Sequence, residues 1–95
     1  MQASTQPTAS LPVCSTLPIL RRNDQQKSPL ENVKVLQQRL NSYGLKVNID
    51  GFFGAKTEKA VKEFQERAND HNPSFLVDGI VGPQTWQALG ACVKG

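Results

Sequence analysis

A turn sequence that occurs twice constrains this chain more than any other feature. The segment "DGFFGAKTEKAV" begins at Asp50, and "DGIVGPQTWQAL" begins 28 residues later at Asp78. Asp, Gly, Gly, Thr and Ala match in register, and both segments end on an apolar residue. Self-similarity at a fixed offset is typical of a chain assembled from repeated structural units. The sequence therefore predicts two similar turns, each leading into a helix.

The first two positions of each copy suit a tight turn. The carboxylates of Asp50 and Asp78 can accept hydrogen bonds from backbone N–H groups just ahead. Gly51 and Gly79 can adopt positive φ without steric cost. Two carboxylates could also form a glycosidase acid pair. Since each Asp is explained by its own Gly, and a catalytic pair would differ in environment, we assign all four residues to structural turns and predict no catalytic residue.

The second glycine of each copy lies where a helix begins. Pro83 suits the first helical position, which places Gly82 at the N-cap and, by register, Gly54 at the N-cap of the preceding helix. Thr57 and Thr85 then fall in the first helical turn, where a hydroxyl can bond back to the loop.

Three helices follow from capping signals and apolar spacing. The first has Ser28 as a predicted N-cap, Pro29 at the first helical position and Glu31 completing a capping box, and it ends at Gly44. Its apolar residues recur at three- and four-residue steps: Leu30, Val33, Leu36, Leu40 and Tyr43. A second helix is predicted over 55–69, where "DHNPS" ends it.

The remaining segments complete the predicted architecture. A short third helix is expected over 83–89, and segments 45–49 and 75–77 are expected to be extended before their turns. The fold class is therefore all-α: a small three-helix bundle with two DG-x-x-G turn-helix repeats and short extended segments. The Ser-, Thr-, Gln- and Pro-rich residues 1–16 are predicted to be a flexible tail, followed by one domain over 17–92.

Charge and composition exclude several function classes. The net charge is +3, but basic and acidic residues alternate from Arg39 to Arg67, which is typical of a solvated helix face and not of a nucleic-acid-binding surface. No apolar run is long enough to span a membrane, and no signal peptide is predicted in this chain. With His71 as its only histidine, the chain is predicted to hold no metal or cofactor, and we expect His71 to face solvent.

Two cysteines, Cys14 and Cys92, stand near opposite ends of the chain. They could be independent buried thiols or one disulfide. A small domain gains most from such a staple, which would close a loop of nearly the whole domain, and we predict the disulfide.

These motifs together resemble one family. "VKVLQQRLNSYGLKVNIDGFFGAKTEKAVKEFQERAN" followed by "VDGIVGPQTWQAL" is similar to the peptidoglycan-binding domain found beside bacterial and phage cell-wall hydrolases. The matching positions are Val33, Leu36, Gln37, Leu40, Gly44, Asp50, Gly51, Gly54, Thr57, Ala60, Val61, Phe64, Gln65, Asp78, Gly79, Gly82, Thr85, Trp86, Ala88 and Leu89. The chain departs from the family before the first helix, where the usual Gly-containing loop is replaced by "ILRRNDQQKSPLENV".

The resemblance implies a three-helix, non-catalytic domain that binds peptidoglycan and directs an attached or associated wall hydrolase. It also implies an extracytoplasmic location in the periplasm, the cell wall or the secreted fraction, and we expect a monomer. The alternative is a protein-interaction or autoregulatory domain of a larger envelope enzyme, suggested by the rebuilt loop and the long tail. A small enzyme is a third class, for which the sequence offers no catalytic constellation.

A ligand made of sugars and peptide needs an apolar platform and hydrogen-bonding groups. The candidate binding residues are Tyr43, Phe52, Phe53, Gln84 and Trp86. Trp86 aligns with Glu58 of the first copy and would be partly exposed if that face is exposed; alternatively, Trp86 is the buried anchor of the short third helix. Gln37 and Gln65 could instead satisfy buried backbone groups.

Overall fold

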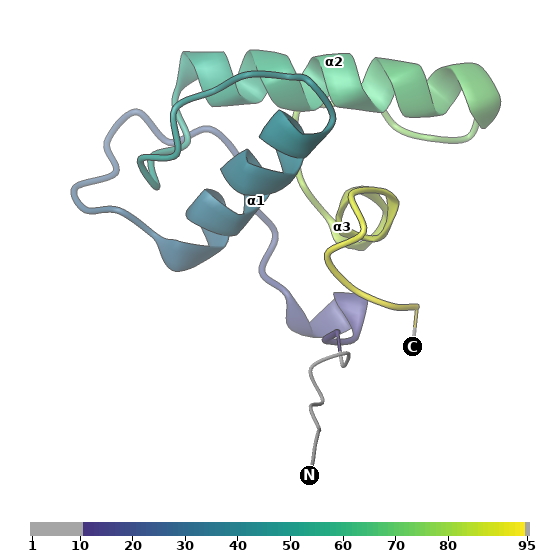
Figure 1. Ribbon diagram of the computed structural model, residues 1–95, viewed down its shortest axis with the longest axis horizontal. Helices are drawn as coiled ribbons and strands as arrows, with labels where there is room; N and C mark the ends of the chain where they lie inside the picture. Colours follow the sequence, from purple (N-terminus) through teal and green to yellow (C-terminus); the bar gives the residue numbers. More distant parts are fainter. Residues whose placement is uncertain (1–10, 95) are drawn as a thin grey trace, which may run out of the picture.

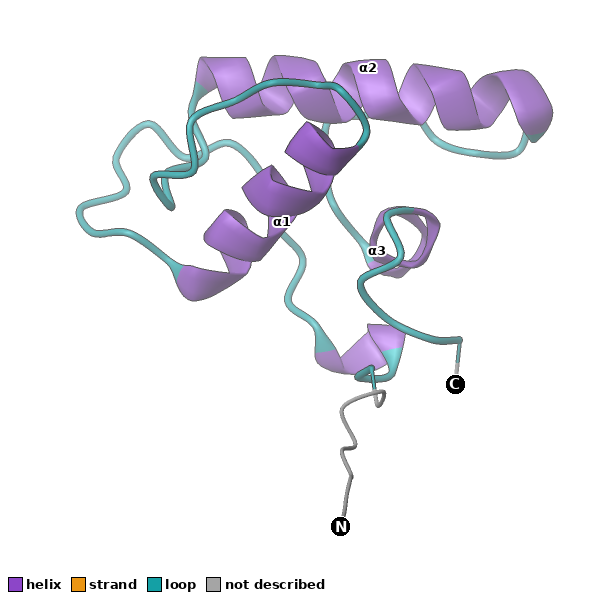
Figure 2. Ribbon diagram, viewed as in Figure 1, coloured by secondary structure: helices purple, strands orange, loops and turns teal. Residues whose placement is uncertain are grey.

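The computed structural model describes residues 11–94, which form an all-α domain (Figures 1 and 2). A short 3₁₀ helix, η2 (Cys14–Thr16), precedes three α-helices: α1 (Glu31–Ser42), α2 (Ala55–His71) and α3 (Pro83–Ala88). No β-strand is assigned within residues 11–94; two isolated bridges join Val13 to Val93 and Leu20 to Val81. The predicted three-helix, all-α architecture is confirmed.

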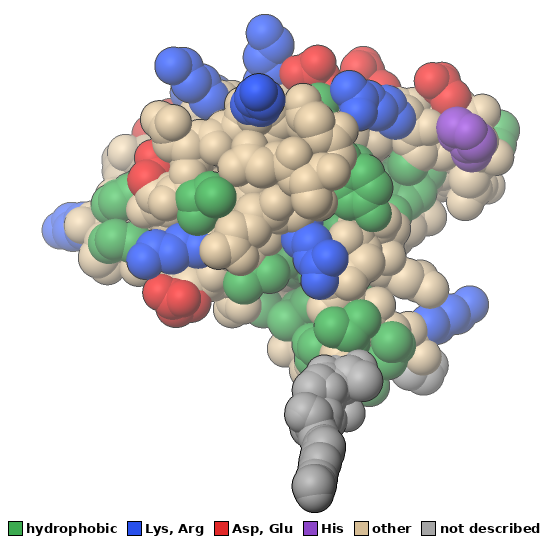
Figure 3. Space-filling model, in the orientation of Figure 1, with side chains coloured by type: hydrophobic (Ala, Val, Ile, Leu, Met, Phe, Trp, Pro, Cys, Tyr) green, Lys and Arg blue, Asp and Glu red, His purple; other side chains and the backbone are tan. Residues whose placement is uncertain are grey.

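One hydrophobic core lies between the helices. In Figure 1, α2 runs along one edge of the molecule, while α1 and α3 lie on the same side of it. The apolar stripes of the helices meet there, and the core includes Val33, Leu36, Leu40, Ala60, Val61, Phe64, Val81, Trp86 and Leu89. Phe53 and Trp86 are the largest of its fully buried side chains. The charged side chains are interspersed along the outer edge over α2 (Figure 3), as the alternating charges predict.

Helix α1 begins two residues later than the capping box predicts. Its N-cap is Leu30, which has extended backbone angles and no side-chain capping bond, so the predicted Ser28 N-cap is wrong. The physical reason is a competing contact, because the N–H of Leu30 donates to the carbonyl of Gly51 at 3.0 Å. This bond holds the residues before α1 against the first turn.

The C-terminus of α1 lies where the sequence predicts, whereas those of α2 and α3 are shifted. At the end of α1, Gly44 has a φ of 84°, and the N–H of Leu45 donates to the carbonyl of Leu40 at 3.0 Å, which is the Schellman pattern. Helix α2 continues to His71, past the predicted end at residue 69. Pro73 disfavours helical angles only at the residue before it, and Asn72 is accordingly the extended C-cap. Helix α3 ends at Ala88, one residue earlier than predicted.

An N-terminal segment that includes η2, which we call the N-terminal strap (residues 12–26), connects both turns to the C-terminus. Leu20 exchanges two backbone hydrogen bonds with Val81, at 3.0 and 2.8 Å, and the N–H of Asn23 donates to the carbonyl of Phe53 at 2.9 Å. The predicted disulfide between Cys14 and Cys92 is present, with a Cα–Cα distance of 4.9 Å. The strap's contacts therefore begin before the predicted domain start at residue 17, and most of the predicted tail lies outside the described residues.

The described part of the chain contains the helices named above. None of its helices has the length and apolar character that crossing a bilayer requires.

Candidate functional site

The first turn is held by a buried glutamine from the preceding helix. Gln37 accepts the N–H of Gly51 at 2.9 Å through Oε1. Its Nε2 lies 3.0 Å from Asp50 Oδ1, 3.0 Å from the Phe52 carbonyl and 3.1 Å from Thr57 Oγ1. Asp50 also accepts the N–H of Phe52 at 3.0 Å. This backbone bond, followed by the amide of Gln37, lowers the pKa of Asp50.

The second turn repeats this network with a glutamine 28 residues later. Gln65 accepts the N–H groups of Asp78 at 3.1 Å and Gly79 at 2.8 Å. Its Nε2 lies 3.1 Å from Asp78 Oδ1 and 2.9 Å from the Ile80 carbonyl. Gly51 and Gly79 have φ values of 79° and 76°. Both Asp–Gly pairs therefore have a structural role: each Asp carboxylate accepts a backbone N–H within its turn, and each Gly adopts the positive φ that the turn requires.

The loop before α1 contributes a second amide to the first turn. Gln26 accepts the N–H of Phe53 at 3.1 Å, and its Nε2 donates to the carbonyls of Gly51 at 2.6 Å and Ser28 at 2.8 Å. This loop thus supports the first turn from outside the repeat.

Two of the candidate binding residues lie in the core. Trp86 is 0% exposed, and its indole Nε1 donates to the carbonyl of Pro18 at 2.9 Å. Phe53 is 1% exposed. Trp86 is therefore the buried anchor of α3, which was the second of the two alternatives for this residue. Because Trp86 and Phe53 are both buried, we leave their side chains out of the candidate site.

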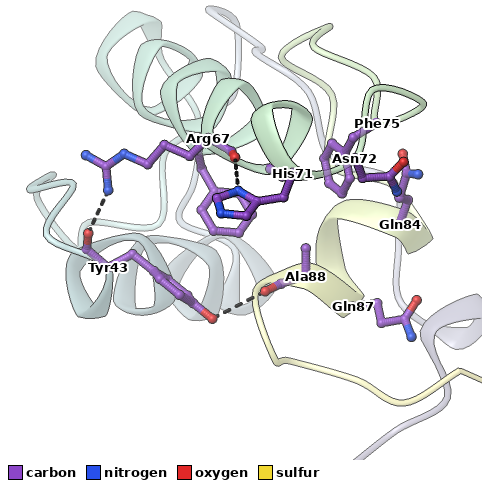
Figure 4. A pocket seen from close by; sticks show the side chains of 10 residues that line it. Tyr43, Arg67, His71, Asn72, Phe75, Gln84, Gln87 and Ala88 are labelled. Carbon is purple, nitrogen blue, oxygen red and sulfur yellow. Dashed lines mark hydrogen bonds between the residues drawn. The ribbon is translucent and has the colours of Figure 1, made fainter.

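Two other candidates, Tyr43 and Gln84, line one open cleft of about 630 Å³ (Figure 4). The cleft lies between the end of α1, the second half of α2 and α3. Its lining residues are Tyr43, Phe64, Arg67, Ala68, His71, Asn72, Phe75, Gln84, Gln87 and Ala88. Tyr43 and Gln84 are 41 positions apart in the sequence, and the fold brings them to the same cleft.

Aromatic side chains form the base of the cleft. The rings of Tyr43 and Phe64 pack with centroids 5.1 Å apart at 58°. The Tyr43 hydroxyl donates to the carbonyl of Ala88 at 3.3 Å, which ties α1 to α3. Phe64 and Phe75 are each 6% exposed, whereas Tyr43 is 44% exposed. The base is therefore apolar and mostly covered.

Polar groups line the rim. Arg67 donates through Nη1 to the Tyr43 carbonyl at 3.1 Å. His71 Nδ1 lies 3.2 Å from the Arg67 carbonyl. Figure 4 shows Arg67 at one end, His71 in the middle, and the amides of Asn72 and Gln84 together at the other end. Such a site can bind a ligand that combines small apolar groups with amides and an anion.

Sequence reasoning missed Arg67, Phe75 and the position of His71. Arg67 lies in the alternating charges of α2, and nothing in that pattern distinguishes it from its neighbours. His71 is exposed, as predicted, but it also lines the cleft because α2 extends past residue 69. Within residues 11–94, no group of three or more His, Cys, Asp or Glu side chains could hold a metal ion.

Phe52 lies elsewhere. It is 36% exposed and lines a smaller hollow of about 250 Å³ beside the first turn, with Val47 and Lys56 among its neighbours. The five candidates are therefore divided between the cleft, the first turn and the core.

Comparisons with known proteins identify the family. Residues 29–89 match the family model described as "Putative peptidoglycan binding domain". A solved peptidoglycan-binding protein from Clostridioides difficile, in complex with glutamine hydroxamate, is 36% identical with a TM-score of 0.64; the match covers 77% of this chain and 40% of that one. The SleB N-terminal domain is 32% identical with a TM-score of 0.63, and the match covers 77% of this chain and 89% of that one. A search of curated proteins found no match.

The chain belongs to the peptidoglycan-binding domain family, as its repeated turns and helix patterns indicate. It spans less than half the length of the Clostridioides difficile protein that it resembles.

Proposed function

We propose that this domain binds bacterial peptidoglycan without cleaving it, and that the cleft beside Tyr43 is the binding site. The observation that carries the proposal is that the cleft lies within the family-matched segment. Every residue lining the cleft falls within the segment matched by the family model, residues 29–89. The name of the 36%-identical relative supports the same ligand.

The chemistry of the cleft supports binding and offers little for bond cleavage. The carboxylates of Asp50 and Asp78 are engaged by their own turns, in matching hydrogen bonds. Neither lines the cleft, and no other Asp or Glu does. An apolar base with amides at its rim is typical of a recognition site.

We further propose that the domain directs a wall hydrolase to its substrate, on the same chain or as a partner, in an extracytoplasmic compartment. The disulfide between Cys14 and Cys92 supports that location, because disulfides persist in oxidising compartments. A fusion of this domain to a hydrolase catalytic domain should accelerate cleavage of insoluble sacculi more than cleavage of soluble fragments. Equal effects on both substrates would contradict delivery.

Sedimentation with purified insoluble peptidoglycan tests the binding proposal. The folded protein should sediment with sacculi at low and moderate salt, and should stay in solution with cellulose, which controls for nonspecific adsorption. It should release no soluble muropeptides. A folded protein that remains in the supernatant with sacculi contradicts the proposal, and capture of a companion enzyme by that same protein would favour the protein-interaction alternative.

A further inference from the structure

The cleft is lined by basic side chains and by no acidic one. The basic side chains are those of Arg67 and His71. None of the ion pairs in the described residues involves Arg67, whereas Arg22 pairs with Asp24 at 2.9 Å. The guanidinium has five N–H donors, and one of them is used on the Tyr43 carbonyl. At one end of the cleft, beside the Tyr43 carbonyl (Figure 4), Arg67 is therefore a cation without an acidic ion-pair partner among the described residues.

The aromatic base is poorly suited to sugar rings. A pyranose ring stacks on an exposed aromatic face, but Phe64 and Phe75 are each only 6% exposed. Tyr43 is 44% exposed, but its ring packs on Phe64 and its hydroxyl is bonded to the Ala88 carbonyl, so its position over the cleft is fixed by these contacts. The small side chains Ala68 and Ala88 open the cleft over these rings. Such a base accommodates methyl groups better than a glycan face.

The glycan strand and the stem peptide of peptidoglycan differ in charge and in apolar groups. Its N-acetylated glycan strand is uncharged where each lactyl group is amide-linked to a peptide. The stem peptide carries alanine methyl groups, backbone amides and free carboxylates. Resting on the proposed function, we infer that the cleft takes the stem peptide, with Arg67 binding a peptide carboxylate and the amides of Asn72 and Gln84 binding its backbone.

Competition for sacculus binding tests this inference. The probes are soluble stem tetrapeptides of the lysine and the diaminopimelate type, the same peptides with their carboxylates converted to carboxamides, and chitotetraose. At least one acidic tetrapeptide should displace the domain from sacculi. Its carboxamide form should compete at least about tenfold more weakly, as expected for the loss of a charge-assisted hydrogen bond. Chitotetraose should not compete.

Variants separate the role of Arg67 from general charge. Arg67→Gln should weaken binding of the acidic peptide about tenfold and leave binding of the carboxamide form unchanged. Arg67→Lys should restore part of the affinity, because it keeps the charge but loses the planar fork. Lys62→Gln removes a charge from the same helix outside the cleft and should have no effect. Melting temperatures of all three variants control for the bond from Arg67 to Tyr43.

Three results would overturn the inference: displacement by chitotetraose and by neither tetrapeptide, equal competition by acidic and carboxamide forms, or unchanged peptide affinity in folded Arg67→Gln. In each case the domain still binds sacculi, so the proposed function stands. Failure of the folded wild type to bind sacculi would instead remove the proposed function.

Discussion

The two copies of the turn have nearly the same hydrogen bonds but begin very different helices. The first begins the 17-residue α2, and the second begins α3, which has 6 residues. A helix of 6 residues is far below the length at which isolated helices form in water. Tertiary contacts must therefore hold α3, and the N-terminal strap supplies them through Pro18, Leu20 and the disulfide.

The matched positions Glu58 and Trp86 show this difference most clearly. Glu58 lies on the surface of α2 and pairs with Arg22 at 3.4 Å. Trp86 is fully buried and bonds to the strap. A repeated turn thus reproduces the local backbone, while the length of the following helix decides whether a position faces the core.

Alanine at these two positions should have the most unequal effects. Trp86→Ala removes the largest buried side chain and should lower the free energy of unfolding by about 3–5 kcal/mol. Glu58→Ala should change it by less than about 0.5 kcal/mol, since the lost ion pair is near the surface. Urea unfolding measures both values. Similar small losses in the two variants would contradict the anchor role of Trp86.

Trp86→Phe refines this result. The variant keeps a buried ring but leaves the Pro18 carbonyl without its donor, so stability should fall while sacculus binding by the folded protein persists. If the Trp86→Phe protein is folded but no longer binds sacculi, the indole takes part in binding and Trp86 belongs to the candidate site.

Loss of the disulfide should affect the second copy first. Replacing Cys14 and Cys92 by serine should lower the free energy of unfolding by about 2–5 kcal/mol. Hydrogen exchange should show faster opening of α3 and of the Leu20–Val81 pair than of the first turn. Uniform loss of protection in both copies would show that the strap does not hold α3 selectively.

Substitution of the turn glycines should destabilise the first copy more than the second, which is the reverse of the order expected for loss of the disulfide. Both have positive φ, so alanine should cost about 1–2 kcal/mol at either position. An added Cβ at Gly51 would lie 2.7 Å from Pro29 Cβ and 3.1 Å from the Leu30 nitrogen, but at Gly79 it would meet the flexible end of Lys62 at 3.0 Å. Gly51→Ala should therefore be the more destabilising change in thermal unfolding, and the reverse order would be inconsistent with this packing.

The fold was predictable from sequence because its signals are local. The Asp–Gly turns, Pro83 and Gly44 each act within a few residues, and they placed all three helices. The Ser28 cap was wrong because Leu30 bonds to Gly51, 21 residues away. Exposure was harder to predict, since Trp86 is held by a contact with Pro18 of the strap, 68 residues away in sequence. Arg67 in the cleft had no local signal at all.

The smallest effect concerns the charge of Asp50. Its pKa is lowered in the folded protein, so the carboxylate adds stability above its ordinary range near pH 4, and this contribution is lost as the pH falls through the folded pKa. Asp50→Asn should therefore melt slightly below wild type at about pH 7, with a smaller difference at about pH 3. A difference that grows on acidification would contradict the sign of the shift.

The central claim is that the cleft beside the second copy, and not the hollow beside the first, binds peptidoglycan. Tyr43 and Phe52 are matched probes, being aromatic residues that are 44% and 36% exposed. The measurement is the sacculus affinity of Tyr43→Ala and Phe52→Ala, each confirmed to be folded. We predict a loss of about tenfold or more for Tyr43→Ala, comparable to a truncated interface hot spot, and wild-type affinity for Phe52→Ala. Wild-type affinity in folded Tyr43→Ala, with a loss in Phe52→Ala, would contradict the account.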